Sequence, residues 1–477
     1  MAKMSSSDRD FLSKVSGAAF ANPYSDARWQ LDAELTKLPA DAEDIVERLI
    51  HRVTETLDRC PLVSELHGED AEHVRYAAYF EAFHLSADDF DDLIRRQAKT
   101  DKALPFPKHA SLVRLLAKRG IPTGEHASAL TLFYQLRRAY FFLSEYLVGE
   151  SAPMRQFKER LWSQLFGHNT LRFYRHLEGR MQDFSVLLVG DTGTGKSAAA
   201  AALGRSGLIP WTGAGFAESF AQLFVPLNLS ELPGPLLESA LFGHIKGAFT
   251  GAVSSRPGAL SRSSAHGVVF LDEIGEVDVP AQIKLLRVLQ ERVFTPLGAN
   301  AEERFEGRVI AATHQPIDEL RRSSRLRNDF YYRLCSDVVN VPPLCDRLRA
   351  DGGEMERLAK SILERTVGDG AASLIDEVLS AIARDIPAGY EWPGNVREVQ
   401  QCIRRVLLTG RCAVDPIYQS ESPDFWTGAK RLDLDLDTLT REYTNAVYQQ
   451  EKSYEGAARL LGIDRRTVKK HVDSVLD

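Results

Sequence analysis

Cysteines, long apolar runs and an excess of positive charge are all missing or scarce in this 477-residue sequence. No uncharged apolar run approaches the roughly 20 residues that cross a bilayer, and the opening segment MAKMSSSDRDFLSKVSG has no apolar core of a secretory signal, so no membrane partner is predicted. The cysteines are odd in number and lack the close pairing of a zinc site, so we expect reduced thiols in a cytoplasmic protein: Cys60, Cys335, Cys345, Cys402 and Cys412.

The overall charge is acidic, with 59 Lys and Arg against 66 Asp and Glu, for a net charge of -7. Any contact with nucleic acid must therefore come from a local basic patch. Hydrophobic residues make up 44% and charged residues 26%, which is typical of a folded, non-fibrous protein. At roughly 100–200 residues per domain, the length predicts three or four domains.

The spacing of apolar residues divides the chain. Spacings of three and four predict a helical domain over residues 1–165, in which segment 130–147 is apolar on most of its circumference and so lies inside a bundle or under a partner. Over 166–345, short apolar runs at 185–189, 224–227, 268–271 and 309–312 alternate with helical stretches, which predicts an α/β domain with a parallel sheet. A helical segment over 346–412, a linker over 413–430 and a small all-α unit over 431–477 complete a multidomain fold.

A glycine-rich segment between the first predicted strand and a helix has the P-loop pattern. Its backbone N–H groups would wrap the phosphates of ATP, Lys196 would neutralise the β- and γ-phosphates, and the Ser197 hydroxyl would bind Mg²⁺. A ligand-free turn is the alternative, but the spacing and both flanks favour nucleotide. The predicted ATP-binding residues are Gly190, Asp191, Thr192, Gly193, Thr194, Gly195, Lys196 and Ser197.

Two carboxylates, Asp272 and Glu273, follow the buried strand VVFL. An acid at the carboxyl end of a strand beside the phosphates can complete the magnesium shell, and the next acid can activate water. We therefore predict Asp272 as a metal ligand and Glu273 as the general base. Two acids after a strand are more often a helix cap, but the P-loop favours hydrolysis.

The segment LFGHIKGAFTGA, Leu241–Ala252, carries a resemblance to a known family. Residues 183–407 resemble the AAA+ ATPase domain of bacterial enhancer-binding proteins, which activate sigma-54 RNA polymerase. Small residues around one aromatic suggest a mobile loop tip that buries Phe249 in a partner. The resemblance implies that this hexapeptide contacts sigma-54 and moves with the nucleotide state: Gly247, Ala248, Phe249, Thr250, Gly251 and Ala252.

Further positions match the family one at a time. The resemblance implies that Asn228 switches Glu273 between poses, and that Arg327 and Arg333 reach the γ-phosphate of a neighbouring subunit in a hexameric ring. Such a cation in trans stabilises the transition state only after assembly. Thr313 ends the strand that leads to sensor I. Arg397, in the lid motif WPGNVRE, is expected to sense bound nucleotide.

Four positions depart from the family pattern. His314 stands where sensor I has asparagine, and Ile245 and Ala240 replace glutamates next to or just before the hexapeptide. Cys345 replaces an arginine. We expect an active ATPase whose coupling to the loop is altered.

The segment Ser453–Val472 fits a helix-turn-helix, with Gly462 at the turn and Asp464 as a cap of the second helix. It also resembles the Fis-type DNA-binding domain that ends these activators. A dimer of this unit should bind inverted half-sites on double-stranded DNA upstream of a promoter. The predicted DNA contacts are Arg465, Arg466, Thr467, Lys469 and Lys470.

The N-terminal domain matches no sensor type, and lacks the strand–helix alternation of a phosphorylation receiver. Glu81 and His84 have di-iron-like spacing, although a single motif of this kind is more often a solvated helix face. A docking surface for a signal or protein is an equal alternative. The sequence as a whole predicts a sigma-54-dependent activator, with two alternatives: an ATPase uncoupled from sigma-54 that acts as a repressor or antagonist, and a remodeller of another target.

Overall fold

The computed structural model describes residues 4–39, 42, 44–168, 170, 176, 179–213, 215–232, 234–412 and 435–473. The predicted linker, 413–430, lies outside the described residues. The chain forms two compact units: residues 1–379 with 390–403, and residues 380–389 with 404–477. None of the helices in the described ranges is long and apolar enough to cross a membrane.

The described part of the chain up to residue 166 contains helices and no strand, as predicted. Val53, Leu57, Val74 and Phe80 belong to its buried core. The helices are α1 (Ser6–Ala19), α2 (Asp26–Thr36), α3 (Ile45–Arg59), α4 (Gly68–Leu85), α5 (Ala87–Gln97), α6 (His109–Lys118), α7 (His126–Tyr146) and α8 (Ala152–Phe166).

The middle of the chain forms a five-stranded sheet in the order β2-β3-β6-β1-β7, and every pair of neighbouring strands is parallel. The four strands expected from the sequence are present, and β7 at the edge is an addition. The strands are β1 (Val186–Val189), β2 (Phe224–Asn228), β3 (Val268–Asp272), β6 (Arg308–Thr313) and β7 (Asp337–Asn340), with an antiparallel hairpin of β4 (Val293–Phe294) and β5 (Glu303–Arg304) beside them.

Both faces of the sheet are covered by helices. Successive side chains of a strand point to opposite faces, so neighbouring residues belong to different cores. One face, with Leu188 and Phe270, shares a continuous apolar core with α10 and the N-terminal helices. The other face, with Leu187 and Leu271, packs under α11, α13 and α15. The helices of this region are α10 (Lys196–Arg205), α11 (Gly234–Phe242), α12 (Ala259–Arg262), α13 (Val279–Glu291), α14 (Ile317–Arg322) and α15 (Asn328–Leu334).

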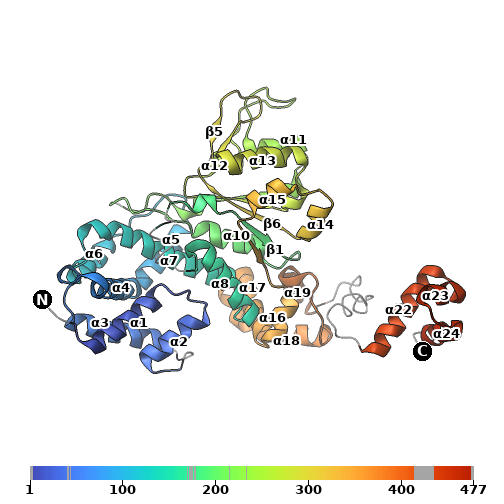
Figure 1. The fold of residues 1–477 in the computed structure, drawn as a ribbon, viewed down its shortest axis with the longest axis horizontal. Coiled ribbons are helices and arrows are strands. Elements are labelled where there is room, and N and C mark those ends of the chain that lie inside the picture. Colours follow the sequence, from blue (N-terminus) through green and yellow to red (C-terminus); the bar gives the residue numbers. More distant parts are fainter. Residues whose placement is uncertain are drawn as a thin grey trace. The chain divides into compact units, whose positions relative to one another are not determined.

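Helix α7 packs along α10 as well as against α5 (Figure 1). This arrangement explains why α7 is apolar almost all round: residues on most of its faces are buried, including Leu130, Phe133 and Phe142. The expectation of a central, covered helix is confirmed, and what covers one side is the helix that follows the P-loop.

Among the described residues, four α-helices follow the sheet over 344–409 and three more lie within 435–473. The short α23 ends at Gly462, whose φ of 67° is the left-handed value predicted for the turn. Val468 and Val472 of α24 pack on Ala457 of α23. The helices are α16 (Leu344–Ala350), α17 (Glu354–Val367), α18 (Ala371–Asp385), α19 (Asn395–Thr409), α22 (Leu436–Glu451), α23 (Tyr454–Leu461) and α24 (Arg465–Asp473).

The prediction that all five cysteines are reduced is wrong for two of them. Cys402 and Cys412 are disulfide-bonded, whereas Cys60, Cys335 and Cys345 form no disulfide and are reduced thiols. Gly410, with a φ of 68°, ends the helix that carries Cys402, and Cys412 follows shortly after this turn. Sequence spacing alone did not indicate which cysteines form a disulfide, because that depends on how the chain folds.

Candidate functional site

The P-loop joins the end of β1 to the start of α10. Gly193 and Gly195 have φ values of 81° and 110°, in the left-handed region that favours glycine. A Cβ on Gly193 would lie 2.3 Å from the carbonyl oxygen of Gly394 in the loop before α19. The Thr194 hydroxyl closes the turn by donating to the Asp191 carbonyl at 2.8 Å. The backbone shape predicted from the glycine pattern is therefore formed.

Lys196 and Ser197 stand at the first turn of α10. The Lys196 ammonium donates to the carbonyls of Gly190 at 2.7 Å and Asp191 at 3.1 Å, and burial lowers its pKa. The Ser197 hydroxyl donates to Asp272 at 3.0 Å, and burial raises the pKa of that carboxyl. A hydroxyl and a half-buried carboxylate beside a phosphate-binding loop are the oxygen ligands that Mg²⁺ prefers, so these residues fit the ion.

Glu273 follows Asp272 with a φ of 57°, a left-handed backbone that is unusual for a side chain of this size. Its Oε2 accepts hydrogen bonds from the His314 ring Nδ1 at 2.7 Å and from the His314 backbone N–H at 3.3 Å. Asn228, the predicted switch residue, instead donates to Glu231 at 2.8 Å. The structure thus pairs the predicted base with His314, one of the four departures, and not with Asn228.

A pocket of about 410 Å³ opens over the P-loop, lined also by Asn228, Asp272, Glu273 and Arg397. The remaining walls come from two segments that the sequence did not indicate. The first lies before the P-loop and was assigned to the N-terminal domain: Tyr146, Leu147, Val148, Met154 and Phe157. The second comes from the helices after the sheet: Arg347, Leu358, Ser361, Ile362, Arg365, Val396 and Gln400.

Arg347 joins these two walls. Its buried guanidinium lies 2.7 Å from Glu354 and donates to the Val148 carbonyl at 2.6 Å, and burial lowers its pKa. Glu354 also accepts from the Glu150 backbone N–H at 3.2 Å. A buried ion pair with its hydrogen bonds satisfied fixes geometry, and here it holds the segment before α8 against α16 and α17.

The WPGN loop before α19 is hydrogen-bonded to the P-loop. The Asn395 amide donates to the Thr192 carbonyl at 3.1 Å, and its oxygen accepts from the Leu344 N–H at 2.8 Å. The Val396 N–H donates to the Gly193 carbonyl at 3.1 Å. Arg397 therefore lies in the pocket next to the phosphate loop, as expected for a residue that senses nucleotide.

The other predicted site residues lie outside this pocket. Thr313 is buried, and its hydroxyl accepts from the Gln315 N–H at 3.1 Å. Arg327 pairs with the exposed Asp329 at 2.7 Å, which holds the pKa of that carboxyl at about 2. Arg333 donates to the Leu289 carbonyl at 3.0 Å. Neither arginine is among the described residues that line the pocket of the same chain.

The hexapeptide loop, residues 243–256, is a compact turn. Gly247 and Gly251 have φ values of 84° and 100°, and the Gly247 N–H donates to the Ala252 carbonyl at 2.9 Å. Phe249 is half-buried, because its ring packs edge-on against His244 with ring centroids 5.1 Å apart. Thr250 is exposed.

This loop is joined to the β4–β5 hairpin by backbone hydrogen bonds. Ile245 N–H donates to the Leu297 carbonyl at 3.1 Å, and Leu297 N–H donates to the Gly243 carbonyl at 2.9 Å. A Cβ on Gly298 would lie 3.2 Å from the Ile245 side chain. Ile245, another departure from the family pattern, thus packs where the hexapeptide loop meets the hairpin.

In the second unit, the five predicted DNA-contacting residues, 465–467, 469 and 470, are exposed along α24. The Asp464 carboxylate accepts from the Arg466 N–H at 2.7 Å, which confirms the predicted cap. Arg465 also pairs with Glu455 at 3.0 Å.

Glu81 and His84 form neither a metal site nor a solvated face. Glu81 is 1% exposed and accepts two hydrogen bonds from the buried Arg119, at 2.5 and 2.7 Å. The His84 ring packs against Phe80 and Phe83. No group of three potential metal ligands of the His, Cys, Asp and Glu types occurs within the described ranges.

Comparison with known proteins identifies the central segment. Residues 172–340 match the family described as the sigma-54 interaction domain. The Nif-specific regulatory protein of Bradyrhizobium diazoefficiens is 42% identical over 221 residues, which is 46% of this chain and 35% of that protein. The protein of the same name from Azotobacter vinelandii is 34% identical over 300 residues, 61% of this chain and 54% of that protein.

A third relative is the transcriptional regulatory protein ZraR of Klebsiella oxytoca, 36% identical over 297 residues, or 60% of this chain and 62% of that protein. This chain therefore spans between 35% and 62% of the length of these relatives. The segment that matches the family, 172–340, includes the P-loop, the acid pair and the hexapeptide loop.

Proposed function

We propose that this chain is an ATP-dependent activator of sigma-54 RNA polymerase, present in the cytoplasm. The observation that carries this function is the hexapeptide GAFTGA, on a turn of the segment that matches the sigma-54 interaction domain, in the same sheet domain as a formed P-loop and acid pair. Nucleotide hydrolysis and the partner-binding loop therefore belong to one domain.

ATP is the substrate that the pocket suits. The P-loop N–H groups and Lys196 bind its phosphates, and Ser197 and Asp272 hold Mg²⁺, which supplies positive charge to neutralise the phosphates. Glu273 accepts the proton of the attacking water, with its carboxylate fixed by His314. Val148, Met154 and Ile362 form an apolar wall suited to the adenine ring of ATP.

Arg327 and Arg333 lie outside their own pocket, which is the arrangement required of groups that act on a second copy. We infer a ring of subunits, hexameric by resemblance, in which these arginines stabilise charge on the neighbour's γ-phosphate. Hydrolysis would then depend on assembly.

In this proposal, the nucleotide site is coupled to the hexapeptide loop through the segment of chain that follows Glu273. After Glu273, α13 runs directly to β4 of the hairpin that is hydrogen-bonded to the hexapeptide loop. A change at Glu273 on hydrolysis would shift α13 and the hairpin, and the loop would move with them, releasing Phe249 from His244 to bind sigma-54. The closed promoter complex would thereby be remodelled to the open one.

Helices α23 and α24 carry the DNA-binding function in this proposal, as a Fis-type helix-turn-helix. From Arg465 to Lys470, exposed basic side chains follow one short helix of an otherwise acidic protein. Inserted in the major groove of upstream double-stranded DNA, α24 would place the cap at Asp464 near the backbone and the basic residues near phosphates and bases. A dimer would bind two half-sites, and the helices before residue 166 would respond to a signal or a protein.

The direct test is promoter opening by purified sigma-54 polymerase with this chain and ATP, measured beside the ATPase rate. Thr250→Ala removes an exposed hydroxyl from the loop, so it should retain ATPase activity and lose open-complex formation. Ser254→Ala, which also removes an exposed hydroxyl nearby, should retain both. Opening by the Thr250→Ala variant at the wild-type rate would contradict the role of the loop.

The second candidate is an ATPase uncoupled from sigma-54, which acts as a repressor or on another target. Ile245 between loop and hairpin and His314 on Glu273 favour it, because both stand on the proposed path of coupling. Hydrolysis without promoter opening would select this alternative.

A further inference from the structure

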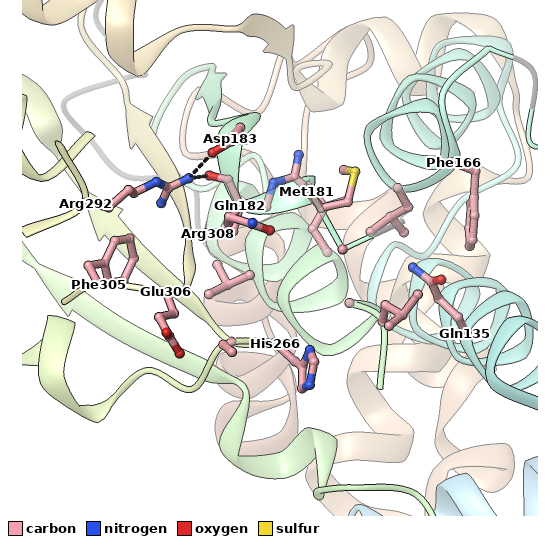
Figure 2. A pocket seen from close by; sticks show the side chains of 18 of the residues that line it. Gln135, Phe166, Met181, Gln182, Asp183, His266, Arg292, Phe305, Glu306 and Arg308 are labelled. Carbon is pink, nitrogen blue, oxygen red and sulfur yellow. Dashed lines mark hydrogen bonds and ion pairs between the residues drawn. The ribbon is translucent and has the colours of Figure 1, made fainter. Parts of the chain in front are cut away.

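A second cavity, of about 480 Å³, lies at the amino-terminal end of the sheet (Figure 2). Its walls include Val268 and Arg308, the first residues of β3 and β6, and Gly207 just beyond α10. The P-loop, Asp272 and Glu273 all lie at the opposite, carboxyl ends of the strands. The cavity is therefore separate from the nucleotide pocket. Gln135 of α7 and Phe166 of α8 form its far wall.

Two buried polar side chains at this cavity lack a full set of hydrogen bonds. Gln135 is 4% exposed, and its amide makes no hydrogen bond with any of the residues that the structure describes. Arg308 is 6% exposed and donates to the carbonyls of Phe184 at 2.7 Å and Gln164 at 3.1 Å, but its Nη2 has no partner within the same ranges. A buried polar atom such as the Nη2 of Arg308 is costly to leave unsatisfied, and a bound molecule or water would satisfy it.

The charge around the cavity is positive. Arg292, Arg304 and Arg308 line it against Asp183 and Glu306, and Arg292 already pairs with Asp183 at 2.9 Å. Within the described ranges no carboxylate pairs with Arg308, and burial lowers its pKa to about 10, which leaves the guanidinium charged at neutral pH. A buried cation without a counter-ion attracts an anion, because the interior screens its charge poorly.

Apolar side chains form the rest of the wall: Leu165, Phe166, Leu203, Leu208 and Phe305. Ligand sites are typically apolar clefts of about 300–1,000 Å³ with a few polar groups that fix orientation. Figure 2 shows these polar groups on two sides of the cavity, with Gln135 on the α7 side and Arg292 and Arg308 on the sheet side.

We propose that this cavity binds a small organic anion with an apolar body, whose acidic group lies toward the arginines and whose apolar part fills the space toward α7 and α8. The occupant would touch the N-terminal helices, the end of α10 and the sheet at once. The site does not depend on the proposed activity toward sigma-54.

The test uses two fluorescent probes that share their aromatic rings. 1-Anilinonaphthalene-8-sulfonate carries a negative charge, and N-phenyl-1-naphthylamine lacks it. In titrations of the full chain we expect saturable binding of one sulfonate probe, at least tenfold tighter than the neutral probe. Equal affinities, or binding that does not saturate, would overturn the proposal.

Three variants locate the site. Ala265 is exposed at the cavity wall, so Ala265→Trp should lower the affinity for the sulfonate probe at least tenfold. Ala127 is exposed on α7 outside the cavity, so Ala127→Trp should leave that affinity unchanged. Arg304 is exposed and lines the cavity. Arg304→Ala should therefore lower the affinity for the sulfonate probe at least threefold and the affinity for the neutral probe less than twofold. Wild-type affinity in folded Ala265→Trp protein, checked by thermal unfolding, would refute the location, and equal weakening of both probes by Arg304→Ala would refute the anion.

Discussion

Removal of the His314 side chain tests how Glu273 is held for catalysis. The His314 ring N–H and backbone N–H both donate to Oε2 of Glu273, at 2.7 and 3.3 Å. His314→Ala keeps the backbone donor and removes the shorter hydrogen bond. Because His314 is not among the described residues that line the nucleotide pocket, the variant should change the pose of Glu273 and not the contacts to ATP.

The size of the effect follows from the hydrogen bond that is lost. A hydrogen bond to a charged group contributes about 1.5–3 kcal/mol, and one backbone donor remains, so the lower end of this range applies. If the bond matters fully in the transition state, kcat should fall about tenfold, since about 1.4 kcal/mol is a factor of ten in rate. The KM for ATP should change less than twofold.

Steady-state ATPase assays over a range of ATP concentrations separate these quantities. His314→Asn restores a side-chain amide donor and should recover kcat to within about threefold of the wild type. Gln315→Ala is the matched control, since Gln315 contacts Glu276 and Arg325 and is the next residue along the chain. A turnover of His314→Ala within twofold of the wild type, or a loss confined to KM, would refute the positioning role.

Three further predictions concern other parts of the chain. Glu273→Gln should bind ATP and form rings but hydrolyse it about 10²–10⁴-fold more slowly, since it removes the base; near-normal turnover would contradict the assignment. His84 should make the folded protein less stable in acid, because burial lowers the pKa of its ring to about 3. As the pH falls below about 6.5, the ring takes up a proton in the unfolded chain but not in the folded one. From pH 7 to 5 the free energy of unfolding should therefore fall by about 1–2 kcal/mol more in the wild type than in His84→Phe. Equal slopes in urea titrations at the two pH values would exclude this. Lys470→Ala should weaken binding to all DNA sequences alike and reduce the slope of log affinity against log salt by about one, measured by fluorescence anisotropy; an unchanged slope would place Lys470 away from the phosphates.

Local sequence patterns were sufficient for the P-loop and the strands beside it. Gly193 and Gly195 adopt the backbone angles that the motif requires, and VLLV and VVFLD are buried strands because their apolar side chains face both covered sides of the sheet. Strand β7, with the sequence DVVN, was not predicted because it lies at the sheet edge and carries only two apolar residues. Short edge strands have a weak hydrophobic pattern.

The pocket walls and the partners of charged groups could not be predicted, because they depend on contacts between distant segments. Arg347 of α16 contacts Val148 in the segment between α7 and α8, and nothing in either local sequence indicates the other. The same holds for Glu81, whose spacing with His84 allowed a metal ligand or, more often, a solvated helix face, whereas Arg119 binds both its carboxylate oxygens. A residue type and a spacing limit the possible chemistry, but the partner decides which possibility is realised.

The N-terminal helices and the five-stranded sheet are parts of one packed body, and this affects how regulation can work. Arg138 of α7 is 0% exposed and donates to the carbonyls of Arg205 at 2.8 Å and Gly207 at 2.6 Å, at the end of the helix that begins at Lys196. A cation at a helix C-terminus stabilises that helix, and the apolar core on this side runs without a break from the N-terminal helices to the sheet. Removal of residues 1–165 would therefore expose the apolar face of α10 and remove part of the nucleotide pocket at residues 146–157. A signal bound by these helices would act on the P-loop through shared packing, so its effect is better sought by substitutions that leave this core intact than by truncation.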